Sequence, residues 1–143
     1  SANVRGDETV QMVKDGNKDA VRVALLGLLA FLVNVDFIIE QPLSTLLFAS
    51  GPVAKLVDIT QTRKTTTWMG AFGGDAPKPL TSISTSSWVT MLRSPKPVGL
   101  NSLVVRRGTR VIGTRRLSGS AAYTPFFGDS VAEFFLTYLE GIF

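Results

Sequence analysis

Apolar residues are concentrated in one stretch of the chain, NKDAVRVALLGLLAFLVNVDFIIEQPLSTL, which covers residues 17–46. Within it, residues 23–39 are apolar on all sides of a helical wheel, apart from Asn34 and Asp36. As a single α-helix this part would be roughly 26 Å long, near the lower limit for crossing the hydrocarbon of a bilayer. The pattern therefore predicts a membrane-spanning helix that Pro42 terminates, and the core helix of a soluble domain is the alternative.

The polar residues of the predicted span indicate contacts at different depths. Arg22 and Glu40 are close enough to its ends to reach the lipid headgroups. Asn34 and Asp36 lie deeper, and an intramembrane amide or carboxylate requires a partner such as another subunit, water or the metal of a bound cofactor. The alternative is that both residues lie in the interfacial region near the helix end.

The remaining sequence lacks a second apolar stretch of this length. Residues 60–90 are rich in Thr, Ser, Gly and Pro and predict a loop that lies across a partner, with Trp68, Phe72 and Trp88 as apolar anchors. Residues 103–117 have β-branched pairs on either side of a glycine, which predicts a short β-hairpin.

The C-terminal stretch, GDSVAEFFLTYLEGIF, predicts an amphipathic helix. Ser130 followed by Glu133 is typical of a capping box, which satisfies two backbone donors at a helix start. The apolar residues after it follow helical spacing. We expect this helix to dock on its own protein rather than to lie in a membrane interface.

Together these patterns predict a mostly α fold with long irregular segments, one transmembrane helix, a C-terminal amphipathic helix and a short β-hairpin. Residues 1–16 are expected to form a polar N-terminal arm, and residues 17–59 the spanning helix with a short apolar segment after it. Residues 60–128 would be an extended basic segment, and residues 129–143 the amphipathic helix. A chain of 143 residues is long enough for one domain.

The composition excludes several kinds of chemistry. The chain has no cysteine and no histidine, which excludes disulfides, thiolate metal sites and mechanisms that need an imidazole base. The glycine-rich sequence GAFGGDAPKP lacks the ending of a phosphate-binding P-loop, and the carboxylates are too scattered for an acid and base pair. We therefore predict that the protein is not an enzyme and has no catalytic residues.

Charge is distributed unevenly along the chain. The formal net charge is +4, yet residues 76–128 contain eight basic residues and no acidic ones. Such a segment needs an anionic partner, which can be nucleic acid, lipid headgroups or an acidic protein surface. Arginine suits phosphate because its guanidinium group bonds two oxygens at once. We predict contact with an anionic partner by the arginine cluster, Arg106, Arg107, Arg110, Arg115 and Arg116.

The apolar stretch also resembles the last helix of chlorophyll-binding light-harvesting antenna proteins. Without a gap, Arg22-Val23-Ala24-Leu25 aligns with the Arg-Leu-Ala-Met of that family, Asn34 with its Gln, and Pro42-Leu43-Ser44-Thr45-Leu46 with its Pro-Leu-x-x-Leu. The resemblance covers about thirty residues. Asn17 replaces the ligating Glu of the family, and Ala20 replaces its ligating Asn.

The resemblance implies a degenerate, single-helix relative of these antenna proteins. It implies that Asn34 and Asn17 contact chlorophyll, with no metal beyond the chlorophyll magnesium, and that carotenoid is a further cofactor. The leading hypothesis is then a non-catalytic accessory subunit of a photosystem or antenna supercomplex in the chloroplast thylakoid membrane, which staples neighbouring subunits and touches lipid. The alternative is a soluble basic nucleic-acid-binding or viral coat-type protein that uses the arginine cluster.

Overall fold

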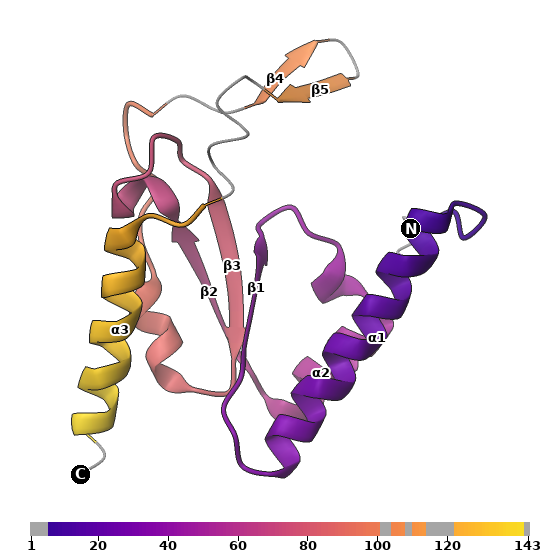
Figure 1. Ribbon diagram of the computed structural model, residues 1–143, viewed down its shortest axis with the longest axis horizontal. Helices are drawn as coiled ribbons and strands as arrows, with labels where there is room; N and C mark the ends of the chain where they lie inside the picture. The colour runs from indigo at the N-terminus through magenta and orange to yellow at the C-terminus, as the bar shows by residue number, and fades with distance from the viewer. Residues whose placement is uncertain (1–5, 101–103, 108–109, 114–121, 142–143) are drawn as a thin grey trace.

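The computed structural model describes residues 6–100, 104–107, 110–113 and 122–141. These residues form three α-helices, three short 3₁₀-helices and five β-strands (Figure 1). In chain order they are α1 (Gln11–Leu32), β1 (Ile38–Pro42), η1 (Leu47–Ala49), α2 (Gly51–Thr60), β2 (Arg63–Trp68), η2 (Met69–Phe72), β3 (Pro79–Ser84), η3 (Ser87–Leu92), β4 (Val104–Arg107), β5 (Arg110–Gly113) and α3 (Pro125–Glu140).

An antiparallel sheet with the strand order β1-β3-β2 is the centre of the fold. Its register pairs Glu40 of β1 with Ser82 of β3, and Ser82 in turn with Thr65 of β2. Because β1 and β2 are both antiparallel to β3, they run in the same direction, and their last residues, Pro42 and Trp68, lie at the same end of the sheet. We call this end the carboxyl end of the sheet.

Helices cover both faces of this sheet (Figure 1). On one face, Ala20 of α1 and Val53 of α2 form a buried cluster with Ile83 of β3. On the other face, η3 contributes the buried residues Trp88 and Val89. The helix α3 packs over η3 through Phe127, Val131, Phe134 and Tyr138.

The predicted fold class is wrong, because the apolar stretch does not form one helix. α1 ends at Leu32, and the same stretch continues as strand β1 from Ile38. Asn34 has a left-handed backbone with a φ of 57°, its N–H donates to the Phe31 carbonyl (3.1 Å), and the Val35 N–H donates to the Ala30 carbonyl (2.8 Å). These two bonds form the Schellman motif that terminates helices. Among the described residues, no helix has both the length and the apolar character that crossing a bilayer requires.

The prediction of a long irregular segment over residues 60–90 is also wrong. Much of it forms β2 and β3, and the buried positions of these strands include Thr65, Thr67 and Ser84. Threonine is β-branched and suits a strand, but its hydroxyl lowers the hydropathy of the pattern. The expected anchors Phe72 and Trp88 are buried in the fold rather than presented to a partner.

Two parts of the predicted fold are present in the structure. The hairpin consists of β4 and β5, which pair antiparallel from Val104 to Gly113. The C-terminal helix exists and docks on its own protein, but it begins at Pro125 instead of Ser130. Thr124 is its N-cap, since the Thr124 Oγ1 accepts from the Phe127 N–H (3.2 Å).

Candidate nucleic-acid interface

The carboxyl end of the sheet gathers side chains from distant parts of the sequence. It contains the ends of β1 and β2, the connection from β2 to β3, and the residues that lead into α3. Loops at the ends of strands commonly carry binding groups, because the strands form a rigid scaffold that positions them. The same end of the molecule leads on to the β4–β5 hairpin (Figure 1).

The connection between β2 and β3 is held by its own backbone. The Met69 N–H donates to the Lys78 carbonyl (3.1 Å), and the Gly74 N–H donates to the Met69 carbonyl (3.0 Å). Gly73 reverses the chain with a φ of 78°. Lys78 itself has a φ of 28°, which is a strained value for a residue with a side chain.

Trp68 ends β2 and is fixed from two sides. Its backbone N–H donates to the Ser94 Oγ (2.7 Å), which ties the chain after η3 to the end of the strand. The Lys96 Nζ lies 5.7 Å from the centroid of the Trp68 ring, within the range of a cation–π interaction. The lysine is exposed, so the ring holds its charge at the surface.

Tyr123 forms a second lysine–aromatic pair at this end. The Lys78 Nζ lies 5.2 Å from the centroid of the Tyr123 ring, and the ring stacks on Phe127 at 5.4 Å. Its hydroxyl donates to the Glu40 carboxylate. Partial burial of the phenol, the hydrogen bond to Glu40 and the charge of Glu40 together raise the pKa of Tyr123 to about 12. The phenol therefore stays protonated at neutral pH.

Glu40 places a carboxylate in the middle of β1. One carboxylate oxygen accepts from the Tyr123 hydroxyl, whereas Oε1 is buried and has no hydrogen-bond partner among the described residues. A buried acceptor without a partner costs free energy. The Thr65 Oγ1, which shares the cross-strand row of Glu40, is also buried without a partner in the described structure.

The hairpin brings part of the predicted arginine cluster together through its backbone. Arg106 ends up in β4, and the register pairs Arg107 of β4 with Arg110 of β5. Arg115 and Arg116 lie outside the described residues. The predicted contact of all five arginines with an anionic partner stays a prediction.

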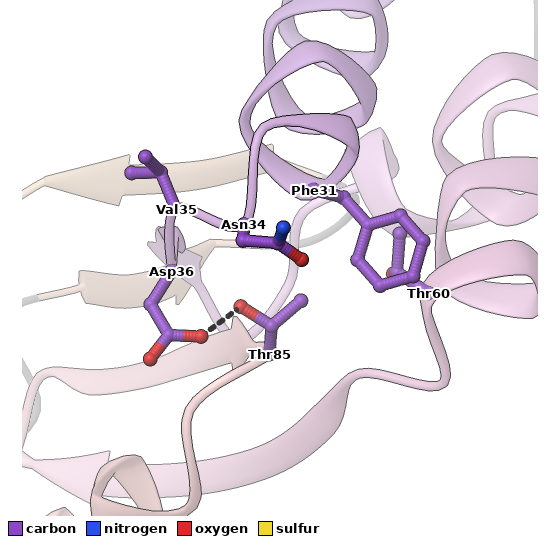
Figure 2. A pocket seen from close by; sticks show the side chains of 6 residues that line it. All are labelled: Phe31, Asn34, Val35, Asp36, Thr60 and Thr85. Carbon is purple, nitrogen blue, oxygen red and sulfur yellow. Dashed lines mark hydrogen bonds between the residues drawn. The ribbon is translucent and has the colours of Figure 1, made fainter.

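Asn34, one of the two predicted pigment-contacting residues, lies at the other end of β1. It lines a pocket of about 300 Å³. The other lining residues are Phe31, Val35, Asp36, Thr60 and Thr85. Figure 2 shows its amide between the Phe31 ring and the pair formed by Asp36 and Thr85, where the Thr85 hydroxyl donates to Asp36 (2.7 Å). The backbone of Asn34 also gives this residue a structural role, because it terminates α1.

Asn17, the other predicted pigment-contacting residue, lies far from Asn34. Its amide donates to the carboxylate of Glu8, which precedes α1 (3.0 Å). From Asn17 to its end at Leu32, α1 rises by roughly 22 Å, and Asn34 lies beyond that end. The structure therefore does not bring Asn17 and Asn34 into one site.

The two lysine–aromatic pairs were not predicted from the sequence. Trp68 was expected to anchor a partner, but neither its lysine nor Tyr123 was identified. Each pair joins residues that are distant in the chain, and no local motif marks such contacts. An available signal was the coincidence of lysines and aromatic residues near breaks in the β-strand pattern.

No protein-family model, no curated protein and no solved structure matches this chain.

Proposed function

We propose that the protein binds nucleic acid through the carboxyl end of its sheet and the β4–β5 hairpin. The observation that carries this proposal is the pair of lysines held over aromatic rings, Lys78 on Tyr123 and Lys96 on Trp68. Both lysines belong to the segment of residues 76–128, which has eight basic residues and no acidic ones.

The rings matter because they order the lysines before a ligand binds. A free lysine loses rotamer freedom when it contacts a phosphate, and this loss weakens binding. A lysine already held at a ring loses less. The geometry therefore favours phosphate contacts by exposed Lys96 and half-buried Lys78 over contacts by lysines that no ring holds.

Contacts of this kind recognise the phosphate backbone and carry no sequence information. The binding should thus be insensitive to nucleic-acid sequence. It should also weaken steeply with salt, because the lysine and arginine side chains displace counterions from the phosphates, and added salt opposes their release. Acidic residues also lie near this end: the Glu40 carboxylate accepts from the Tyr123 hydroxyl, and Asp75 lies in the connection between β2 and β3. They limit the net positive charge there but do not cancel the basic segment.

The pigment-binding and photosystem hypotheses stay untested predictions, and we do not propose either as the function. They depended on a spanning helix, and α1 ends at Leu32. The contacts of Asn34 and Asn17 give them no support, since one residue terminates a helix and the other bonds Glu8.

The test is fluorescence anisotropy with labelled single-stranded and duplex oligonucleotides between about 50 and 200 mM salt. We expect binding that weakens with salt, each phosphate contact adding about −0.7 to the slope of log K against log salt for single strands and about −0.9 for duplex. Absence of binding at the lowest salt, or an affinity that salt does not change, would contradict the proposal.

A matched pair of double variants locates the interface. Lys78→Gln with Lys96→Gln should lower the magnitude of the single-strand slope by about 1.4, because two phosphate contacts are lost. Lys14→Gln with Lys55→Gln removes the same charge from exposed positions on α1 and α2 and should leave the slope nearly unchanged. Equal effects of the two variants would place the interface elsewhere.

A further inference from the structure

The second half of α1 exposes a continuous apolar surface. Leu25, Leu26, Leu29, Leu32 and Val33 are 61%, 66%, 58%, 68% and 59% exposed. We call these five residues the leucine face. Leu25, Leu29 and Leu32 follow one another at intervals of four and three, the spacing at which one helix packs along another.

The opposite side of α1 packs on the protein through small residues. Ala20 is buried against the sheet, and Gly27 approaches α2 so closely that an added Cβ would lie 2.7 Å from the Leu56 Cδ2. An ordinary surface helix turns its large apolar residues inward and its polar residues outward. This half of α1 has the reverse arrangement, which indicates a partner for the leucine face.

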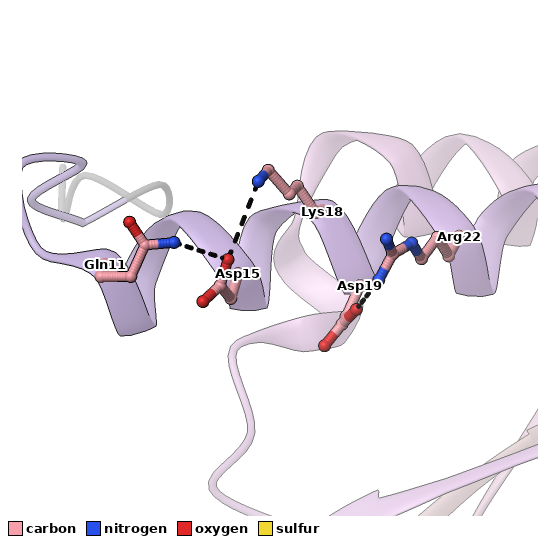
Figure 3. Close-up of polar contacts among 5 residues, drawn as sticks. All are labelled: Gln11, Asp15, Lys18, Asp19 and Arg22. Carbon is pink, nitrogen blue, oxygen red and sulfur yellow. Dashed lines mark hydrogen bonds and ion pairs between the residues drawn. The ribbon is translucent and has the colours of Figure 1, made fainter.

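The first half of α1 is polar and its charges are largely compensated (Figure 3). Asp15 pairs with Lys18 (3.8 Å), and Asp19 pairs with Arg22 (2.9 Å). The Gln11 amide also donates to Asp15 (2.9 Å). The apolar surface therefore starts after Arg22, and a helix packed on it meets little net charge at its boundary.

We infer that the leucine face is covered by the same face of a second copy of this chain, with the two α1 helices antiparallel about a twofold axis near Leu29. Charge favours this occupant. The protein is basic, but its basic segment, residues 76–128, lies outside α1. The helix itself has three basic and two acidic residues, so two copies of α1 repel each other little. In Figure 1 the end of α1 lies far from the β4–β5 hairpin, so two copies can meet there with their basic ends apart.

An antiparallel arrangement also suits the helices themselves. The opposed macrodipoles attract each other weakly, whereas parallel dipoles repel. With the twofold axis near Leu29, Leu26 of one copy lies opposite Leu32 of the other and Leu25 lies opposite Val33, so that one patch is enough for a closed dimer. The dimer rests only on contacts of α1 and is independent of nucleic-acid binding.

Sedimentation equilibrium from low to high micromolar concentration tests the inference. The wild-type mass should rise toward twice 15.4 kDa. The double variant Leu25→Lys with Leu29→Lys should stay at the monomer mass and keep the helical circular dichroism of the wild type, because both side chains are exposed. The control Leu136→Lys changes an equally exposed leucine of α3 and should still dimerise. A wild-type monomer at every concentration, or a control that also loses dimerisation, would overturn the inference.

A crosslink identifies the surface without disturbing its charge. The chain has no cysteine, so Leu29→Cys introduces a single thiol beside the proposed axis. Mild oxidation should convert this variant to covalent dimers much faster than it converts the Leu136→Cys control. Equal rates, or binding of the wild type to neutral phosphatidylcholine vesicles that the Leu25→Lys and Leu29→Lys changes abolish, would show that a second copy is not the occupant.

Discussion

At the scale of single residues, Asn34 shows how one position can suggest a ligand and serve the backbone. Its place in the apolar stretch predicts a buried amide that requires a hydrogen-bond or metal partner. In the structure it occupies the left-handed position after α1, which Gly and Asn adopt most readily. Asparagine after an apolar helical run is a known stop signal, and it explains this residue without a pigment.

Substitutions at Asn34 should follow its backbone conformation. Asn34→Gly should leave the free energy of unfolding unchanged or raise it by up to about 1 kcal/mol, because glycine adopts positive φ without strain. Asn34→Leu should lower it by about 1 kcal/mol, since a larger side chain makes that conformation unfavourable. Urea denaturation measures both values, and the reverse order would show that the amide side chain matters more than the backbone.

Tyr123 makes stability depend on alkaline pH. Its pKa is raised to about 12 in the folded protein, while an unfolded tyrosine titrates near 10. The folded state therefore holds its proton more tightly, and the resulting stability is complete below pH 10 and is lost as the pH rises through 12. Absorbance at alkaline pH should show a phenol that titrates late in the wild type.

The variants separate the causes of this shift. Tyr123→Phe should abolish the loss of stability that this phenol causes between pH 10 and about 12. Glu40→Gln removes the carboxylate but leaves the burial, which is the largest cause, so the pKa of Tyr123 should fall only part of the way. A pKa that returns fully to the ordinary value in Glu40→Gln would show that burial contributes little.

At the scale of elements, β2 and β3 are built with buried hydroxyl groups. The Thr67 Oγ1 donates to the Leu92 carbonyl (2.9 Å) and links β2 to η3, but the Thr65 Oγ1 is buried without a partner in the described part of the chain. These two threonines lie on the same strand, at 1% and 2% exposure. They therefore offer a comparison in which only the hydrogen bond differs.

Replacing each threonine by the isosteric valine should give opposite results. Thr67→Val leaves the buried Leu92 carbonyl without its donor and should lower the free energy of unfolding by about 1 to 2 kcal/mol. Thr65→Val removes an unsatisfied hydroxyl and should raise it by about 1 kcal/mol. Losses of similar size at both positions would mean that Thr65 has a partner in solution.

The elements also show where the sequence was informative. The hairpin and the C-terminal helix were predictable because β-branched pairs around a glycine and helical spacing act locally. The division of the apolar stretch into α1 and β1 was not, since an apolar run fits a helix or a buried strand equally well. The sheet was missed because its buried strands contain Thr and Ser, which lower the hydropathy signal.

The candidate interface was predictable in charge but not in geometry. Composition alone identified the acid-free segment and its arginine cluster. The pairs of Lys78 with Tyr123 and of Lys96 with Trp68 depend on how β2, β3 and α3 meet in three dimensions. Contacts between residues so far apart in the chain produce no recognisable spacing pattern in the sequence.

At the scale of the whole molecule, two surfaces lie at different ends. The carboxyl end of the sheet leads to the basic hairpin, and the leucine face lies at the far end of α1 (Figure 1). A dimer formed through α1 would present two basic ends that point apart. Two such ends could bind separate segments of one nucleic acid, which raises the overall affinity without new contacts.

The buried serines and threonines of the central sheet also affect how stability varies with temperature. Thr81, Ser82 and Ser84 of β3 are at most 4% exposed, so unfolding hydrates polar as well as apolar groups there. Hydration of apolar surface raises the heat capacity and hydration of polar surface lowers it. Calorimetry should therefore give a heat-capacity change below the usual value of about 12 to 15 cal/mol/K per residue. A smaller change flattens the stability curve, so the protein would resist cold better than a domain with a wholly aliphatic sheet.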